Sequence, residues 1–428
     1  MTDLPRNFCL LPFTSMLVRA NGTCSVCCIN SGTAKRADGE DIYLYRDSIQ
    51  EAFQAPFFQE LRESMLKGER HPSCQSCWSV EDAGFLSKRT DDLKTLREWT
   101  EKAQQGVFPE HPVDLSLNLG TQCNLKCRIC SPVSSSKWAQ ELLDLYGMDH
   151  VPRNNDVIQN MSAEESRALL VNWPYRDPKF TQTLFSWLPL MSRMEFLGGE
   201  PFLNKKQFEI VKKSVEIGAA KNQILQFVTN GTTYPEEAIQ NDWPHFKSVQ
   251  VNISVDGLED HFEYQRFGAK WEEAMFNIDR YRSLKCVALV QIYVSISIFS
   301  IYYFPEMLLF WSKRGLNVCI SIVTQPDRFD VRALPPALKE RVRQKYSGIM
   351  KGVSPELKQK LKDVEDFMMS GDLSNLWLKA IENIWFHDRY RKQKFVDFFP
   401  EFYEQAKMAG VWYDYETQKE LFHGKNST

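Results

Sequence analysis

The sequence has no surplus of basic residues. Its 428 residues include 52 Lys and Arg against 55 Asp and Glu, for a formal net charge of −3. Proteins that follow long nucleic acids need a basic surface to neutralise phosphates. The basic clusters that do occur, such as "KKQFEIVKK", have the spacing of a solvated helix face. The charge balance therefore argues against a long nucleic acid as a partner.

An uninterrupted apolar run is also missing. The longest apolar segment, residues 286–304, is broken by Gln291, Ser295 and Ser297, and its alternating β-branched residues predict a buried strand rather than a membrane span. The opening "MTDLPRNFC" lacks the basic and then apolar pattern of a signal peptide. We therefore expect a cytoplasmic protein that does not bind a membrane.

Histidine is scarce, and none of the seven histidines accompanies a motif, so the sequence offers no candidate for a general base. Internal repeats and low-complexity segments are missing as well. The composition, 43% hydrophobic and 25% charged, is typical of a chain with a large core. At about 100–200 residues per domain, two or three domains are expected.

Cysteine, by contrast, is abundant and clustered. Six of the eleven cysteines lie within residues 1–82, and three more lie in "CNLKCRIC". In a chain without the pattern of secretion, such spacing favours metal ligation over disulfides. Cys286 and Cys319 stand alone in apolar runs, and we expect them to pack in the core.

Strand-like and helix-like segments alternate along the middle of the chain. Alternation of this kind predicts parallel strands joined by helical crossovers, as a full or partial barrel or as an open doubly wound sheet. A helix is also expected from Ser162, which forms a capping-box pattern with Glu165. The six predicted strands span residues 113–119, 193–199, 224–231, 248–257, 286–299 and 317–324.

The same patterns divide the chain into four parts. Residues 1–82 are loop-rich and hold six cysteines, and residues 83–112 read as a helix and a linker. Residues 113–330 contain the alternating segments, and residues 331–428 are predicted to be helical.

Polar or glycine-rich segments follow the first four predicted strands. They are the three-cysteine loop, "GGEP", "TNGT" and "DG". Because the carboxyl ends of parallel strands meet at one edge of a sheet, these segments predict a site at that edge.

The three-cysteine loop offers one ligand fewer than a closed metal site needs. Structural zinc takes four protein ligands, and iron–sulfur clusters usually take four thiolates. Three ligands in a short loop leave a coordination position open for a substrate or cofactor. A zinc site completed by a distant residue remains the alternative.

The loop "CNLKCRIC" resembles the CxxxCxxC motif of the radical S-adenosylmethionine enzymes. The resemblance implies an α/β fold with a partial (β/α)6 TIM-like barrel. In this chain, a small Cys-rich module, described below, would precede the barrel, and a helical carboxy-terminal region would follow it. It implies a [4Fe–4S] cluster on Cys123, Cys127 and Cys130 whose unique iron binds S-adenosyl-L-methionine. Reductive cleavage then gives a 5′-deoxyadenosyl radical that abstracts hydrogen from a substrate.

The same resemblance assigns contacts to S-adenosylmethionine. Glu200 would contact the ammonium group, since a carboxylate is the right partner for an amine. Asn230 and Asp256 are equally well explained as turn residues beside a glycine, and Ile129 stands where the family usually has an aromatic residue. The cofactor-binding residues implied are Ile129, Gly198, Gly199, Glu200, Pro201, Asn230, Ser254 and Asp256.

The amino-terminal cysteines resemble a second type of module. Cys9-x12-Gly22-x4-Cys27, followed by Cys74-x2-Cys77, is similar to the auxiliary-cluster modules called SPASM and twitch. The resemblance implies a second [4Fe–4S] cluster on the four cysteines. The single-cluster twitch form fits better, because the later cysteines of SPASM are missing.

Other interpretations of this module remain open. Cys24 and Cys28 are alternatives to Cys27 as a ligand, and a structural zinc site uses the same spacing. The family usually places the module after the barrel, whereas here it comes first. Arg266, downstream of the fourth strand, either anchors a substrate or cofactor or forms a surface salt bridge.

The expected function is hydrogen abstraction from a substrate, assisted by the auxiliary cluster. Related modules often act on peptides, so a peptide is the first substrate class, with a nucleotide or small metabolite as the alternative. An external electron donor of the flavodoxin or ferredoxin type is implied by the resemblance. A non-catalytic zinc-binding protein is the competing hypothesis.

Overall fold

A computed structural model describes residues 4–82, 86–146, 174 and 178–412. The chain forms two compact units and passes from one to the other between Asn124 and Leu125, inside the three-cysteine loop. The first unit comprises residues 1–124, 131–252 and 279–289, and the second comprises residues 125–130, 253–278 and 290–428.

The strands form an open sheet in the order β2-β1-β3-β4-β5-β6-β7-β8. The pairs β1–β3, β3–β4, β4–β5 and β7–β8 are parallel, and β1–β2 is antiparallel. The strands are β1 (Ser15–Val18), β2 (Cys24–Ser25), β3 (Asp114–Asn118), β4 (Arg193–Leu197), β5 (Ile224–Thr229), β6 (Ser248–Ser254), β7 (Val287–Ile296) and β8 (Asn317–Ile322).

All six predicted strands are confirmed, and the α/β class with them. The sequence missed β1 and β2, which extend the sheet from the predicted auxiliary module: β1 pairs with β3, and Ser15 lies opposite Asp114. The four residues of β1 are all buried. A parallel strand buried on both faces has no alternating pattern, so the sequence did not reveal this one.

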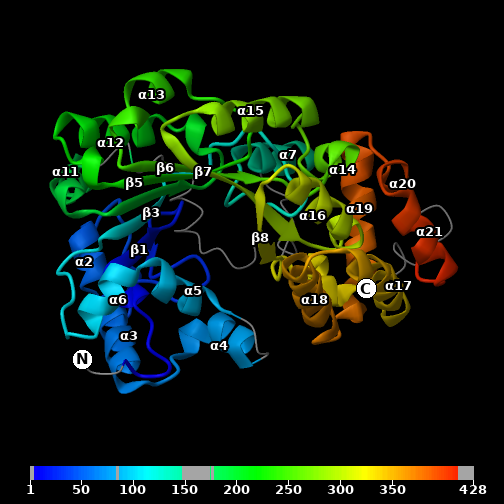
Figure 1. Cartoon of the computed structure of the whole chain (residues 1–428), viewed down its shortest axis with the longest axis horizontal. Helices are drawn as coiled ribbons and strands as arrows, with labels where there is room; N and C mark the ends of the chain where they lie inside the picture. Colours follow the sequence, from blue (N-terminus) through cyan, green and yellow to red (C-terminus); the bar gives the residue numbers. More distant parts are fainter. Residues whose placement is uncertain (1–3, 83–85, 147–173, 175–177, 413–428) are drawn as a thin grey trace. The chain divides into compact units, whose positions relative to one another are not determined.

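In the first unit, helices cover both sides of the strands. Figure 1 shows α11, α12 and α13 on one side of β5 and the helices of the amino-terminal segment on the other. The buried side chains of Leu115, Phe196 and Phe227 form part of the hydrophobic core between the strands and these helices. The helices are α1 (Leu11–Thr14), α2 (Ile49–Phe53), α3 (Pro56–Lys67), α4 (Gln75–Asp82), α5 (Lys88–Thr95), α6 (Arg97–Ala103), α7 (Ser136–Tyr146), α11 (Pro178–Trp187), α12 (Lys205–Glu216) and α13 (Glu236–Asn241).

In the second unit, the predicted carboxy-terminal helices are confirmed as far as residue 412. Within the described ranges, we find no helix that is both long and apolar enough to cross a bilayer. The helices are α14 (Glu259–Gln265), α16 (Phe304–Lys313), α17 (Pro336–Ile349), α18 (Pro355–Met369), α19 (Trp377–Arg391), α20 (Phe395–Phe398) and α21 (Pro400–Met408), while α15 (Trp271–Ser283) has residues in both units.

Three local predictions from the sequence are not confirmed by the structure. The single helix expected before the linker is two helices, α5 and α6, which meet at Leu96. Cys286 and Cys319 are half-buried rather than packed in the core. The helix expected from Ser162 lies outside the described residues.

His261, on α14, gives the second unit a pH-dependent stability. Its ring lies 4.1 Å from that of Tyr303 and stacks on Phe399 at 4.8 Å. Burial lowers the pKa of His261, since desolvation disfavours the charged imidazole. The unfolded chain then binds the proton more readily than the folded chain. The free energy of unfolding therefore falls as the pH drops below about 6.5, the ordinary histidine value.

We expect the His261→Phe variant to lose this dependence. Urea unfolding at about pH 5.5 and pH 7.5 should show a larger difference in free energy for the wild type than for the variant. His245→Phe, at an exposed position, is the matched control and should behave like the wild type. Equal pH dependence in the His261 variant and the wild type would contradict the assignment.

Candidate functional site

The carboxyl ends of β3, β4 and β5 meet in the first unit, as the sequence predicts. The parallel register places Asn118 opposite Leu197, so the loops after β3 and β4 begin side by side. The first of these loops carries Cys123, and the second is "GGEP". The site is built where these loops touch.

Glu200 joins all three loops. Its side chain is 1% exposed, and its carboxylate accepts hydrogen bonds from Thr229 Oγ1 and the Asn230 backbone N–H, both at 2.8 Å. Its own N–H donates to the Gln122 carbonyl at 2.8 Å. A buried carboxylate with several donors holds its neighbours firmly, because leaving those donors unpaired is costly.

Asn230 continues this network to the cysteine loop. Its amide Nδ2 donates to Asn124 Oδ1 at 2.9 Å, and its Oδ1 accepts from the Thr232 hydroxyl at 2.7 Å. Asn124 Nδ2 in turn donates to Thr232 Oγ1 at 2.8 Å. Asn124 directly follows Cys123, so the network fixes the chain next to the first cysteine.

The two glycines of "GGEP" are required by close packing. Gly198 has φ +119°, and a Cβ atom there would meet Asn118 Oδ1 at 2.3 Å. A Cβ atom on Gly199 would meet the Gln122 carbonyl oxygen at 2.2 Å. Only glycine tolerates such a backbone conformation and approach without strain. Pro201 then begins a short 3-10 helix, Pro201–Leu203.

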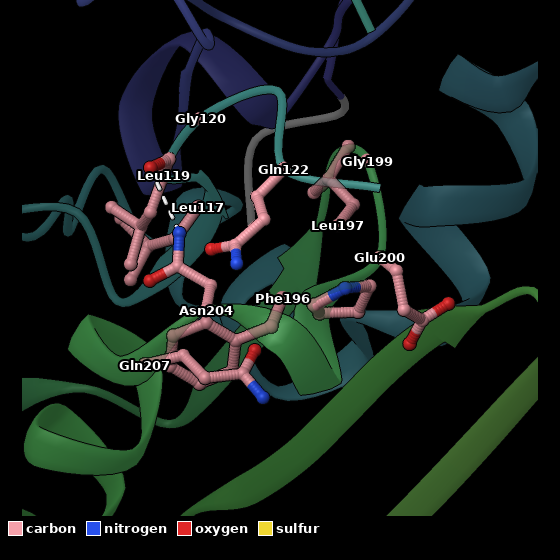
Figure 2. A pocket seen from close by; sticks show the side chains of 11 residues that line it. Leu117, Leu119, Gly120, Gln122, Phe196, Leu197, Gly199, Glu200, Asn204 and Gln207 are labelled. Carbon is pink, nitrogen blue, oxygen red and sulfur yellow. Dashed lines mark hydrogen bonds between the residues drawn. The ribbon is translucent and has the colours of Figure 1, made fainter. Parts of the chain in front are cut away.

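A small cavity lies beside this motif, between the ends of β3 and β4 and the start of α12. Asn204, the N-cap of α12, donates to the Leu119 carbonyl across it at 2.9 Å. Figure 2 shows the Glu200 side chain extending away from Asn204 and Gln207. Glu200 also lines this cavity, and its carboxylate contacts Thr229 at the end of β5.

Cys127 and Cys130 belong to the second unit. The Cys130 N–H donates to the Cys127 carbonyl at 3.0 Å, which closes a tight turn. The chain before this turn pairs with the segment after α14. The Lys126 N–H donates to the Phe267 carbonyl at 3.0 Å, and the Arg128 N–H donates to the Gln265 carbonyl at 2.7 Å.

Arg266 lies beside both of these thiols. Its guanidinium is 3.9 Å from Cys127 Sγ and forms a 2.8 Å ion pair with Asp256. Burial opposes the charge, but the Asp256 carboxylate and the thiols of Cys127 and Cys130 more than offset it, so the pKa of Arg266 is raised. The ion pair of Arg266 with Asp256 is buried, whereas the alternative considered from the sequence was a surface salt bridge.

The other residues predicted to contact a cofactor in this unit lie on strand ends and loops. Asp256 also accepts the Ser295 N–H at 2.8 Å, so its carboxylate serves the protein's own structure. Ser254 is the last residue of β6, and Ile129 lies within the cysteine turn. Both side chains are half-buried.

The four cysteines predicted for the auxiliary module surround one cavity in the first unit. It has about 390 Å³ of space not filled by atoms, part of it open to solvent. Leu11, Trp78 and Ile29 supply apolar walls, and Lys88 and Arg89 supply two cations. The cysteines that line it are Cys9, Cys27, Cys74 and Cys77.

The thiols that line this cavity influence one another electrostatically. Burial raises the pKa of Cys9, and Cys27, Cys74 and Cys77 raise it further. Burial also raises the pKa of Cys27 to about 12. Thiols of this kind become thiolates when a positively charged metal centre binds, so the residues fit a four-thiolate cluster.

The two spare cysteines lie apart from this cavity. Cys24 is 0% exposed and lies on β2, and Cys28 is exposed. Neither lines the cavity, whereas Cys27 does. Within the residues that the structure describes, no three His, Cys, Asp or Glu side chains are close enough to hold a single metal ion.

Several residues of the site were missed by the sequence analysis. Asn124, Thr229 and Thr232 lie within or beside the recognised motifs, and their polar side chains were an available signal. Asp388, which pairs with Arg128 of the cysteine loop, had no such signal. The two residues are separated by 260 positions, and only the fold brings them together.

Comparisons with known proteins come from three searches. Residues 9–78 match the family model described as SPASM, an iron–sulfur cluster-binding domain. The comparison with curated protein sequences gives no match. The family match covers all four cysteines of the auxiliary cavity.

Among solved structures, native anSMEcpe with bound AdoMet is 16% identical, with a TM-score of 0.36, and the match covers 61% of this chain and 63% of that one. Streptococcus suis SuiB bound to S-adenosylmethionine is 12% identical, with a TM-score of 0.35 and coverage of 82% and 70%. SuiB bound to its precursor peptide SuiA is also 12% identical, with a TM-score of 0.34 and the same coverage. These TM-scores are too low to establish a common fold.

The prediction of an amino-terminal iron–sulfur module is therefore confirmed by the family match and by the four-cysteine cavity. The match names SPASM, whereas the sequence favoured the shorter twitch form. The segment of residues 9–78 is thus similar to the SPASM iron–sulfur cluster-binding domain.

Proposed function

We propose that this protein is a radical S-adenosylmethionine enzyme. The observation that carries the proposal is the three-cysteine loop, whose first part is held at the strand ends by the Glu200–Asn230–Asn124 network. Cys123, Cys127 and Cys130 would hold a [4Fe–4S] cluster with one iron left for the cofactor. When bound, this cluster supplies the electron that cleaves S-adenosylmethionine and starts hydrogen abstraction from a substrate.

Glu200 has the properties needed to orient the cofactor. It is a buried anion at the strand ends, and its position is fixed by the hydroxyl of Thr229 and the N–H of Asn230. A fixed carboxylate pairs well with an ammonium group, and the pairing is stronger in a site that excludes water. We assign Glu200 to the amino group of the methionine moiety.

Arg266 favours the thiolate form of the cysteines in the turn, which is the form that binds a metal. The thiolate is the form that binds iron, and a nearby cation favours it over the thiol. Arg266 lies 3.9 Å from Cys127 Sγ, and Asp256 holds it there. We assign this pair to stabilising the Cys127 and Cys130 thiolates.

The auxiliary cavity would hold a second [4Fe–4S] cluster with a full set of four thiolates. Full ligation leaves no iron open to a substrate, in contrast to the three-cysteine loop. We therefore assign this cluster to electron transfer. The substrate class that we propose is a peptide, with a nucleotide or small metabolite as the alternative, and a flavodoxin- or ferredoxin-type protein as electron donor.

The decisive experiment is anaerobic incubation of reconstituted protein with S-adenosylmethionine and dithionite. Release of 5′-deoxyadenosine and methionine is expected, from brown protein with about eight iron atoms per chain, as two cubane clusters require. Colourless protein that contains zinc and releases no 5′-deoxyadenosine would overturn the proposal in favour of a zinc-binding protein.

Asn30 is expected to tune the auxiliary cluster. Its Nδ2 donates to Cys74 Sγ at 3.4 Å and to Ser73 Oγ at 3.0 Å. Hydrogen bonds to ligand sulfurs stabilise the reduced state and raise the reduction potential. Asn30→Ala should therefore lower the potential of the auxiliary cluster by on the order of tens of millivolts.

Redox titration followed by electron paramagnetic resonance measures this shift. Asn222→Ala, at an exposed position far along the chain, is the control and should leave both potentials unchanged. An unaltered auxiliary potential in Asn30→Ala would show that the hydrogen bond to Cys74 has no effect on the cluster.

A further inference from the structure

Helix α19 of the carboxy-terminal region contacts the cysteine turn through one carboxylate. Asp388 accepts hydrogen bonds from Arg128 Nη2 at 2.5 Å and from the Tyr264 hydroxyl at 2.8 Å. Its second oxygen accepts the Phe395 N–H at 2.6 Å. Asp388 is 6% exposed, so this is a buried charge with several partners.

Arg128 stands between Cys127 and Ile129 in the loop. Its guanidinium carbon lies 3.7 Å from the centre of the Tyr264 ring, and its Nη2 also donates to Gln393 Oε1 at 2.8 Å. The side chain is 4% exposed. The turn that carries two of the three cysteines is therefore anchored by a side chain that points away from them and into the carboxy-terminal region.

The chemistry of this contact makes it specific. A buried arginine needs a charged partner, and removing one member of a buried ion pair leaves the other charge uncompensated, which is strongly destabilising. Tyr264 and the Phe395 N–H fix the carboxylate, so Arg128 has one favourable position. By comparison, the exposed pair of Lys362 and Asp366 on α18 has no such constraint.

We propose that Asp388 is a positioning residue for the cluster loop, and that α19 is an integral part of the cluster site. Through Arg128, Asp388 holds the main chain of Cys127 and Cys130 in the conformation that receives the cluster. This inference rests on the proposed function, because it concerns the same three-cysteine loop. It gives the carboxy-terminal helices a structural role in the cluster site, where the sequence analysis could assign none.

The first test needs no cluster. Hydrogen exchange in apo-protein is measured over residues 125–130, where the N–H groups of Arg128 and Cys130 are hydrogen-bonded. We expect Asp388→Ala to speed exchange in this segment by about tenfold or more, while Asp366→Asn leaves it unchanged. Asp388→Asn keeps the shape of the side chain but loses its charge, so its exchange rate should lie between those of the wild type and Asp388→Ala.

The second test uses reconstituted protein. Asp388→Ala should retain the iron of the auxiliary cluster and lose most of the loop cluster, from about eight to about four iron atoms per chain. S-adenosylmethionine should change the electron paramagnetic resonance spectrum of the reduced wild type. In Asp388→Ala, this change should be lost. Asp388→Glu, which keeps the charge, should restore part of both signals.

The outcomes separate the two proposals. If the wild type loads no loop cluster, the proposed function fails, while the exchange experiment still decides the role of Asp388. If the wild type loads both clusters and Asp388→Ala has unchanged exchange, iron content and spectrum, the positioning role is wrong. Should Asp388→Ala not fold, Asp388→Asn and Gln393→Ala give the same readouts with smaller perturbation.

Discussion

Replacing Cys127 by alanine is expected to abolish the release of 5′-deoxyadenosine and to remove about half of the iron. Two cubane clusters hold about eight iron atoms per chain, and the variant should keep about four. The loop site would lose one of its three thiolates, whereas the auxiliary cavity keeps Cys9, Cys27, Cys74 and Cys77. The two sites have no ligand in common, so loss at one leaves the other intact.

Two further variants make this result specific. Cys77→Ala should remove the other half of the iron and leave the loop cluster, with S-adenosylmethionine cleavage still detectable. Cys319→Ala, a half-buried position on β8, should retain both clusters. Iron and sulfide analysis with visible spectroscopy measures all three variants. Full iron content in Cys127→Ala would show that the loop is not a cluster site.

Replacing Glu200 by alanine is expected to have the second largest effect, on both stability and cofactor binding. The hydroxyl of Thr229 and the N–H of Asn230 would lose their buried acceptor. Unpaired buried donors cost about 1–3 kcal/mol each, so the loss of both should lower the free energy of unfolding by about 2–6 kcal/mol. Loss of the partner of the cofactor's amino group should weaken S-adenosylmethionine binding by about ten- to a hundredfold.

The isosteric Glu200→Gln variant separates these two effects. It keeps one acceptor oxygen and should recover part of the stability, but it lacks the charge that an ammonium group requires. Glu216→Ala, at the exposed end of α12, is the matched control. Urea unfolding gives the stability and equilibrium dialysis gives the affinity. Unchanged cofactor affinity in both Glu200 variants would exclude this residue from the binding site.

The contacts differ in kind between the two units. In the first unit, Glu200 and Asn230 fix the strand-end loops. In the second unit, Arg266 lies beside the Cys127 thiol, and Asp388 pairs with Arg128 of the cysteine turn. Each contact uses a buried group with defined partners. Buried polar contacts of this kind hold the cysteine loop in place without regular secondary structure.

The sequence alone was sufficient for six of the eight strands, β3 to β8. Period-two alternation in 113–119 and the apolar run of 286–299 are local properties, and local patterns decide local structure. The set of Cys9, Cys27, Cys74 and Cys77 was predicted from the resemblance to a cysteine motif, and the cavity is lined by those four. The resemblance left Cys24 and Cys28 open as replacements for Cys27, because all three occupy one short segment.

Tertiary structure decided the contacts between distant segments. The strand β1 joins the sheet because a parallel partner, β3, is present about 100 residues later. The pairing of Arg128 with Asp388 depends on the fold in the same way. Spacing and alternation report only on neighbours in the chain, whereas burial and charge pairing depend on which surfaces meet. The sequence by itself therefore determined which cysteines are predicted as ligands, and only the folded chain decided which contacts hold their loops in place.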